Sequence, residues 1–345
     1  MTTQPSPIQG RGTSHNPPTR YKELHVELDE RPQPRTHVRQ ERARSILAHN
    51  KSPDIPFTYS LNPYRGCEHG CVYCYARPTH EYLGLSPGLD FETRLIAKVN
   101  AAELLREALC DPRWTPTPIT FSGVTDPYQP IERELRLTRA CLEVLAELRH
   151  PASIITKSHL VTRDLDRLTE LASHRAITVL VSLTTLDGAL HQKLEPRASH
   201  PRRRLHTIQA LAEAGIPVGV MTAPIIPGLN DTEVPRLLKA AAGAGASFAG
   251  YTLLRLPGPV APLFDAWLAQ HLPDRRERVL SRIRDMRGGD LNTPGFGARM
   301  RGQGDGAQVL RGLFHQSCRR VGLSTRGPNL STRAFRRPGE QLTLF

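Results

Sequence analysis

The sequence contains few cysteines and no long hydrophobic run. Only six of its 345 residues are cysteine, and so low a content in a chain of this length argues against a fold built on disulfides. No apolar stretch approaches the roughly 18 residues that a membrane-spanning helix needs, and no apolar leader follows Met1. We therefore expect a protein of the reducing cytoplasm.

Positive charge is concentrated at the carboxyl end. The net charge is +13, and residues 271–345 contain 15 arginines, no lysine and six acidic residues. Because arginine can donate two parallel hydrogen bonds to phosphate oxygens, DNA is an expected partner of this region. A solvated basic tail without a partner is the alternative. The sequence contains no recognisable base-reading module, so sequence-specific binding is not indicated.

Short β-branched runs alternate with helical patterns along the middle of the chain, which is typical of parallel βα units. Six strands are expected, over residues 58–64, 118–124, 153–158, 176–185, 216–225 and 248–256. The expected helices cover residues 92–109, 131–149, 164–173, 201–214 and 232–244. This pattern predicts an α/β fold, a partial (β/α)6 TIM-like barrel whose functional groups lie at the carboxyl ends of the strands. A doubly wound sheet is the structural alternative.

The regions outside this core differ from it in composition. Residues 1–55 are rich in proline, glycine and polar residues, which predicts a flexible, disordered arm. Residues 56–260 are expected to form the core, residues 261–337 a basic carboxyl-terminal extension, and residues 338–345 a separate tail.

Three cysteines, Cys67, Cys71 and Cys74, follow the first expected strand and are separated by three and two residues. An iron-sulfur cubane held by only three thiolates keeps one iron open to a further ligand. A zinc site that adds His69 or His80 is the alternative. The remaining cysteines fall in helix-like stretches, where buried thiols are expected: Cys110, Cys141 and Cys318.

The C-x3-C-x2-C spacing, with Tyr73 before the third cysteine, resembles the signature of the radical S-adenosylmethionine (SAM) superfamily. The resemblance implies a (β/α)6 partial barrel and a [4Fe-4S] cluster on the three cysteines, with S-adenosylmethionine bound to the open iron. It also implies that an electron donor reduces the cluster and that SAM is cleaved to a 5'-deoxyadenosyl radical. In such an enzyme the cofactors supply the difficult chemistry, and the protein supplies position and substrate choice.

Polar residues at later strand ends match further parts of the same pattern. The segment FSGVTDPYQPIE, residues 121–132, resembles the second-strand motif that meets the methionyl amino group, which assigns Gly123, Thr125 and Asp126 to SAM. Lys157 ends the third expected strand and Ser182 lies in the fourth. Both are expected to face the same rim of the barrel, and with Tyr73 they are assigned to the SAM site.

Two more segments complete the expected SAM site. In LEPR, the resemblance places Glu195 at the ribose hydroxyls and Arg197 at the SAM carboxylate, with Arg204 as the alternative arginine. The segment APIIPGLND follows the fifth expected strand, and its Ile226 would pack near the adenine.

The segments NPYRGCEHGCVYCYAR, VTDPYQP and LEPR resemble the branch related to spore photoproduct lyase, a DNA repair enzyme, over about residues 56–256. In that branch a cysteine near the end of the second strand returns a hydrogen atom to the product, but FSGVTD has Val124 and no cysteine. We expect a radical SAM enzyme that repairs or modifies a DNA nucleotide by another route. The alternatives are a radical SAM enzyme acting on RNA or protein, and a non-catalytic, zinc-stabilised nucleic-acid adaptor.

The final residues, QLTLF, resemble the bacterial sliding-clamp-binding pentapeptide. Gln341, Leu342, Leu344 and Phe345 would dock in a hydrophobic groove of the clamp, which makes the clamp an expected partner. A terminal strand tucked against the domain is the alternative.

Overall fold

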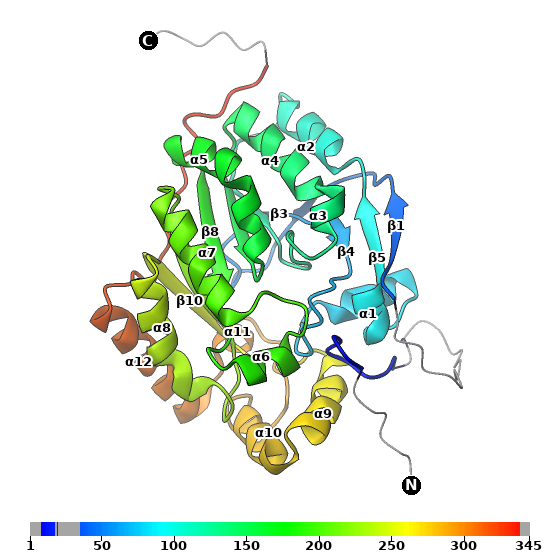
Figure 1. Ribbon diagram of the computed structural model, residues 1–345, viewed down its shortest axis with the longest axis vertical. Coiled ribbons are helices and arrows are strands. Elements are labelled where there is room, and N and C mark those ends of the chain that lie inside the picture. Colours follow the sequence, from blue (N-terminus) through cyan, green and yellow to red (C-terminus); the bar gives the residue numbers. More distant parts are fainter. Residues whose placement is uncertain (1–7, 18, 20–34, 339–345) are drawn as a thin grey trace.

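The computed structural model describes residues 8–17, 19 and 35–338 (Figure 1). The clamp-like residues 341–345 lie outside this described part. A seven-stranded sheet forms the centre, in the order β10-β9-β8-β7-β6-β3-β2. Its strands are β2 (Leu47–His49), β3 (Tyr59–Leu61), β6 (Ile119–Phe121), β7 (Ala152–Thr156), β8 (Ile177–Ser182), β9 (Val218–Ile225) and β10 (Phe248–Leu253).

The six strands expected from the sequence are all present and pair in parallel, while β2 adds an antiparallel edge. Their order in the sheet follows their order in the chain without the reversal that defines a doubly wound sheet. Because successive parallel strands are joined by right-handed connections that all run in the same direction, the connecting helices lie on one face of the sheet. The fold is therefore mixed α/β and consistent with a partial TIM-like barrel.

The helices between the strands pack through apolar faces. They are α2 (Ala101–Cys110), α4 (Leu137–Leu148), α5 (Leu165–Ser173), α7 (Pro201–Glu213) and α8 (Val234–Gly243). Leu168 and Leu171 of α5, and Ile208 and Leu211 of α7, are fully buried in the main core. Short helical segments complete the connections: α3 (Glu132–Leu135), α6 (Gly188–Leu194), η1 (Arg77–Leu83), η2 (His159–Asp164), η3 (Asp231–Glu233) and η4 (Pro273–Arg275).

Residues 92–109 do not form the single helix that their spacing predicts. Helix α1 (Leu89–Thr93) is followed at once by strand β5 (Arg94–Lys98) and only then by α2. Strand β5 pairs with β1 (His37–Glu41) and β4 (Tyr64–Arg65) in a second sheet of order β1-β5-β4. The short apolar run of residues 94–98 is compatible with a helix or a strand. It forms a strand here because it pairs with residues 37–41, which are distant in the sequence.

The described parts of residues 1–55 pack against the rest of the chain, although the composition predicts a flexible arm. Strands β1 and β2 lie there, and the Gly12 N–H and the Thr13 hydroxyl donate to the Glu92 carboxylate at 3.0 and 3.1 Å. A Cβ on Gly12 would lie 1.7 Å from the Gly70 carbonyl oxygen, so only glycine fits this close approach. These parts belong to the folded body.

The expected basic extension also folds onto the core. It contains α9 (Val260–His271), α10 (Arg276–Asp285), α11 (Ala298–Arg301) and α12 (Gly304–Arg320). Helix α12 packs on α8 and buries Phe314 in the main core. No helix in the described ranges combines the length and the apolar character needed to cross a membrane.

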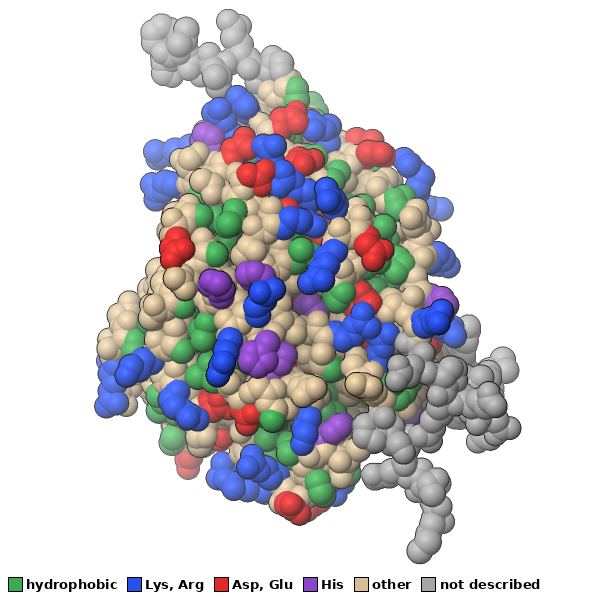
Figure 2. All heavy atoms as spheres, viewed as in Figure 1, with side chains coloured by type: hydrophobic (Ala, Val, Ile, Leu, Met, Phe, Trp, Pro, Cys, Tyr) green, Lys and Arg blue, Asp and Glu red, His purple; other side chains and the backbone are tan. Residues whose placement is uncertain are grey.

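Beyond α12 the backbone runs past the amino-terminal ends of the strands. Ala249 donates to the Ser324 carbonyl, Ser331 to the Arg175 carbonyl, and Arg336 to the Leu148 carbonyl. In Figure 1 this segment climbs past α5 to the top of the view, whereas α9 and α10 lie at the bottom. On the face in Figure 2, Lys and Arg side chains are scattered among acidic ones. The basic residues therefore do not form one patch on this face.

Candidate functional site

A cavity of about 400 Å³ opens at the carboxyl ends of the parallel strands. All three cysteines of the 67–74 loop line it, together with residues from the ends of β6, β7, β8, β9 and β10. Six of the nine residues predicted to bind SAM are in its wall: Tyr73, Gly123, Thr125, Asp126, Lys157 and Ser182. The motifs found separately in the sequence thus converge on one place.

The cysteine loop is shaped by two glycines and a buried amide. Gly66 and Gly70 have φ values of 76° and 67°, which glycine adopts without steric cost. The Gln129 side chain donates to the Gly66 carbonyl at 3.1 Å and accepts the Glu68 N–H at 3.0 Å. Cys67 is buried, and all three cysteines are free thiols.

The fully buried Arg77 side chain fixes the loop from behind. Its guanidinium donates to the Cys71 carbonyl at 3.1 and 2.9 Å and to the Pro87 and Gly88 carbonyls at 3.2 and 2.9 Å. It also pairs with Glu92 at 2.6 Å, and neither side chain is exposed. Sequence analysis missed Arg77, whose only signal was its position three residues after the third cysteine.

These thiols suit an iron-sulfur cluster better than a single zinc ion. Within the described ranges, no group of three or more His, Cys, Asp or Glu side chains could hold one ion. The proposed fourth ligands are already engaged, since His80 Nε2 lies 2.9 Å from the Arg94 carbonyl and His69 Nδ1 lies 3.3 Å from the Asp126 carboxylate. Three thiols around one cavity match three corners of a cubane.

Burial raises the pKa of the Cys71 and Cys74 thiols. The thiolate form is the one that ligates a metal, so a bound cluster would supply the positive charge that these buried sulfurs need.

Asp126 connects the cysteine loop to the strand ends. Its carboxylate accepts the Thr156 hydroxyl and the Lys157 N–H, both at 2.7 Å, and lies next to His69. Burial by itself would raise the pKa of Asp126, but His69 and the donated hydrogen bonds outweigh it and lower the pKa. Burial likewise opposes the charge on His69, yet Asp126 and Cys67 raise its pKa to about 10. His69 and Asp126 therefore form a charged pair in this wall of the cavity.

Glu195 lies behind the cavity wall and is fully engaged. It accepts the Tyr73 hydroxyl, accepts the Thr184 hydroxyl at 2.6 Å, and pairs with the buried Arg204. Burial would raise its pKa, but Arg204 and Lys157 lower it to about 2. The Lys157 ammonium lies 6.0 Å from the Tyr73 ring centre, on the cavity side of this network.

Two further predicted residues also lie away from the cavity wall. Arg197 pairs with Glu68 at 2.9 Å, on the outer side of the cysteine loop. Ile226 is fully buried in a smaller apolar cluster. Arg204, the alternative to Arg197, also donates hydrogen bonds to the Ser199 and Ser182 carbonyls. The structure therefore separates Glu195, Arg197 and Ile226 from the six residues that share the cavity.

The loop after β6 has an unusual backbone. Ser122 and Gly123 have φ values of 109° and 101°, and such a value is rare for a residue other than glycine. Strained residues of this kind cluster at ligand sites. The conformation turns the Gly123 carbonyl toward Tyr75, whose hydroxyl donates to it at 2.8 Å.

The cavity wall also contains residues that sequence analysis did not identify. They include Ile55, Pro56, Phe57, Tyr75, Met221, Thr252, Leu253, Arg255 and Met300. Tyr75 is 46% exposed, and the Arg255 guanidinium lies 5.0 Å from its ring centre. The only sequence signal for Tyr75 and Arg255 is their position: Tyr75 follows the third cysteine, and Arg255 follows the last strand.

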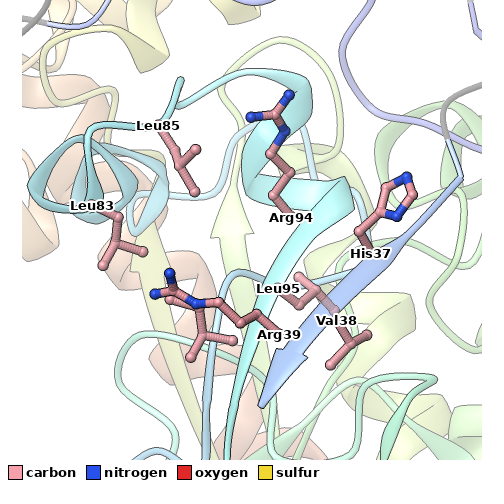
Figure 3. A pocket seen from close by; sticks show the side chains of 8 residues that line it. His37, Val38, Arg39, Leu83, Leu85, Arg94 and Leu95 are labelled. Carbon is pink, nitrogen blue, oxygen red and sulfur yellow. The ribbon is translucent and has the colours of Figure 1, made fainter. Parts of the chain in front are cut away.

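A second hollow, of about 620 Å³, lies on the smaller sheet (Figure 3). Its wall consists of His37, Val38, Arg39, Leu83, Leu85, Arg94, Leu95 and Ile96. Arg94 pairs there with Asp90 at 3.3 Å. None of the predicted site residues lines this hollow, and its wall has no thiol or carboxylate. The chemistry is therefore assigned to the first cavity.

Comparison with known proteins agrees with this geometry. The family model of the Radical SAM superfamily matches residues 61–241. An uncharacterized protein of Mycobacterium tuberculosis is 39% identical over 242 residues, which cover 69% of this chain and 70% of that protein. The radical SAM Nalpha-GlyT isomerase of Pseudomonas phage M6 is 28% identical over 187 residues, covering 53% of this chain and 36% of the isomerase.

Among solved structures, a variant of spore photoproduct lyase with bound dinucleoside spore photoproduct has a TM-score of 0.62 at 16% identity. The match covers 89% of this chain and 88% of the lyase. At this identity the similarity concerns the fold.

Proposed function

Because the chain belongs to the radical SAM superfamily, we propose that this radical SAM enzyme holds a [4Fe-4S] cluster on Cys67, Cys71 and Cys74 and binds SAM in the adjoining cavity. Three free thiols and six strand-end residues converge there, and this convergence is the observation that supports the assignment. When bound, and given one electron from an external donor, these cofactors would supply methionine and a 5'-deoxyadenosyl radical for the removal of a hydrogen atom from the substrate.

The chain's own residues position and shield these groups. Arg77 keeps the Cys71 segment in place through its backbone carbonyl. Gly123 lets the backbone approach the methionyl end of SAM without a side chain in the way. Asp126 and Lys157 place opposite charges at the cavity wall for the amino and carboxylate groups. The apolar part of the wall excludes water from a reactive radical.

We propose a DNA nucleotide as the substrate. The net charge of +13 favours a polyanion, and the fold resembles that of a lyase whose structure contains a dinucleoside photoproduct. The hydrogen-return step would differ from that of the lyase branch, because Val124 lines the cavity. Cys141 and Cys318 are fully buried in the main core, so neither can return a hydrogen atom in the cavity.

Anaerobic reconstitution tests the cofactor assignment. We expect about four irons per chain for a protein with one cubane, and 5'-deoxyadenosine when SAM and dithionite are added. Cys71→Ala should lose both, whereas Cys110→Ala, on helix α2 outside the loop, should keep both. Wild-type iron and product in Cys71→Ala would refute the assignment.

The substrate assignment needs a separate measurement. Single-stranded DNA carrying a photolesion should accelerate 5'-deoxyadenosine formation, and an RNA of the same sequence or an unrelated peptide should not. In deuterated solvent, a route without a relay thiol should return the hydrogen atom from 5'-deoxyadenosine, leaving the product without solvent deuterium. Acceleration by RNA or peptide alone would assign the chain to the alternative substrate class.

A further inference from the structure

Part of the cavity wall is built by residues outside the superfamily match. The match begins at residue 61 and ends at residue 241, whereas Ile55, Pro56 and Phe57 precede it and Thr252, Leu253, Arg255 and Met300 follow it. These residues share one cavity with the three cysteines and Lys157. They are therefore candidates for contact with a substrate that meets SAM in this cavity.

Arg255 has no carboxylate partner within the described part of the chain. Its Nη1 lies 3.6 Å from the Met300 sulfur, its guanidinium stacks on the Tyr75 ring, and its buried Nε has no hydrogen-bond partner. Neighbouring Arg299, in contrast, donates to both oxygens of the Asp54 carboxylate. Arg255 is half-buried, and a partly desolvated guanidinium without a counter-charge favours the binding of an anion.

The cavity carries two cations with different charged neighbours. Lys157 has Cys71, Glu195 and Asp126 as its acidic neighbours, which places it beside the cysteine loop and the expected SAM carboxylate. The charged side chains that act on Arg255 include Arg299, Arg287 and Asp54, and the one carboxylate among them, Asp54, is already engaged by Arg299. The anion that Arg255 lacks is therefore expected from the substrate.

We infer that Arg255 binds a backbone phosphate of the nucleic-acid substrate, held in place by the Tyr75 ring and Met300. The guanidinium fork matches the paired oxygens of a phosphodiester. Aromatic and apolar side chains beside it, Tyr75 and Phe57, suit the stacking of a base next to that phosphate. The inference rests on the proposed function and specifies how its substrate is recognised.

Fluorescence anisotropy with a labelled single-stranded DNA dodecamer tests this contact in the reconstituted enzyme. Arg255→Ala should weaken binding about tenfold and lower the slope of log affinity against log salt by about 0.7, as expected for one lost phosphate contact. Arg255→Lys keeps the charge and should keep most of the slope. Arg106→Ala, on helix α2 and outside both the cavity wall and residues 271–345, should change neither quantity. An unchanged slope in Arg255→Ala would overturn the inference.

Dinucleotide competition identifies the group that is bound. A thymidine dinucleotide with an ordinary phosphodiester should compete about tenfold better than its neutral methylphosphonate analogue on the wild type, and equally on Arg255→Ala, if one charge-assisted pair is lost. A drop in SAM cleavage without DNA would reassign Arg255 to the SAM carboxylate. Competition by an acidic peptide alone would indicate a protein substrate, and either result overturns the inference.

Failure of the proposed function would be distinguishable. A wild-type protein without iron, or without 5'-deoxyadenosine formation, would contradict the cofactor assignment whatever Arg255 does. The phosphate contact is judged only in preparations that contain the cluster, and Arg255→Ala should match the wild type in iron content.

Discussion

Replacing Arg77 by methionine tests whether a buried charge keeps the cysteine loop in shape. Arg77 and Glu92 are fully buried and 2.6 Å apart, and Arg77 also donates to the carbonyls of Cys71, Pro87 and Gly88. Methionine has a similar length but no donors. In the variant, the buried Glu92 carboxylate would lose its directly paired cation and keep only Arg11 as a further positive charge nearby, and three carbonyls would lose a donor.

The expected cost is large. Removing one partner of a buried ion pair lowers the free energy of unfolding by about 3–5 kcal/mol, compared with a total of about 5–15 kcal/mol for a typical domain. A loss of about 4 kcal/mol changes the ratio of folded to unfolded protein about a thousandfold. Adding Glu92→Gln removes the stranded charge while keeping an acceptor for the Gly12 N–H, so the double variant should recover about 1–3 kcal/mol.

Urea unfolding followed by the fluorescence of Trp114 and Trp267 measures these differences, and iron per chain reports on the loop. We expect the iron content of Arg77→Met to fall as well, because the Cys71 carbonyl loses both hydrogen bonds from the guanidinium and keeps only the Cys74 N–H. Arg106→Met is the matched control: Arg106 pairs with Glu147 at 2.5 Å, but the two side chains are 42% and 48% exposed, so its loss should cost less than about 1 kcal/mol. Equal costs for the two variants, or no recovery in the double variant, would refute the reasoning.

Two further changes test other parts of the structure. Gly12→Ala should lower iron content, because its Cβ would lie 1.7 Å from the Gly70 oxygen; Gly243→Ala, where no atom lies within 4 Å of the added Cβ, should leave it unchanged. His150 Nε2 accepts the Trp114 N–H at 3.1 Å, and burial lowers its pKa from 6.5 to about 4. Because the folded-state pKa is the lower one, the contribution of His150 is complete above pH 6.5 and is lost as the pH falls toward 4, by up to about 1.4 kcal/mol per pH unit. Replacement by glutamine should flatten the free energy of unfolding in that window, and an unaltered pH profile would exclude His150 as the titrating group.

Local patterns predicted the six parallel strands because each is a short run of mainly apolar, aromatic or β-branched residues between turn residues, and that information lies within the run itself. They did not predict β5, since RLIAK is compatible with a helix and becomes a strand by pairing with residues 37–41. Local patterns also did not predict that residues 8–17 pack against the folded core. Gly12 and Thr13 are held by hydrogen bonds to Glu92, and a composition poor in apolar residues does not reveal such bonds.

The same distinction applies to the site. Asp126, Lys157 and Ser182 were found because parallel strands bring their carboxyl ends to one edge of the sheet. Glu195 directly follows α6, a helix that the sequence pattern did not reveal, and its place behind Tyr73 depends on Arg204 in the next helix. Tyr75 and Arg255 carry no local pattern at all, since their meeting depends on how the chain closes after the last strand.

The cysteine loop and the part of the cavity wall outside the superfamily match are supported by different hydrogen bonds. The cysteine loop is fixed by Arg77 and Gln129, which bond within the first part of the domain. Asp54 accepts from Arg299 at 2.8 Å and from the Gly297 N–H at 3.1 Å, which ties the 52–57 segment to the 297–300 segment. Tyr75 joins the two parts, because it follows Cys74 and its ring contacts the Arg255 guanidinium. Substitutions at Asp54 or Arg299 are therefore expected to alter this part of the wall while the Arg77 and Gln129 contacts of the cysteine loop stay in place.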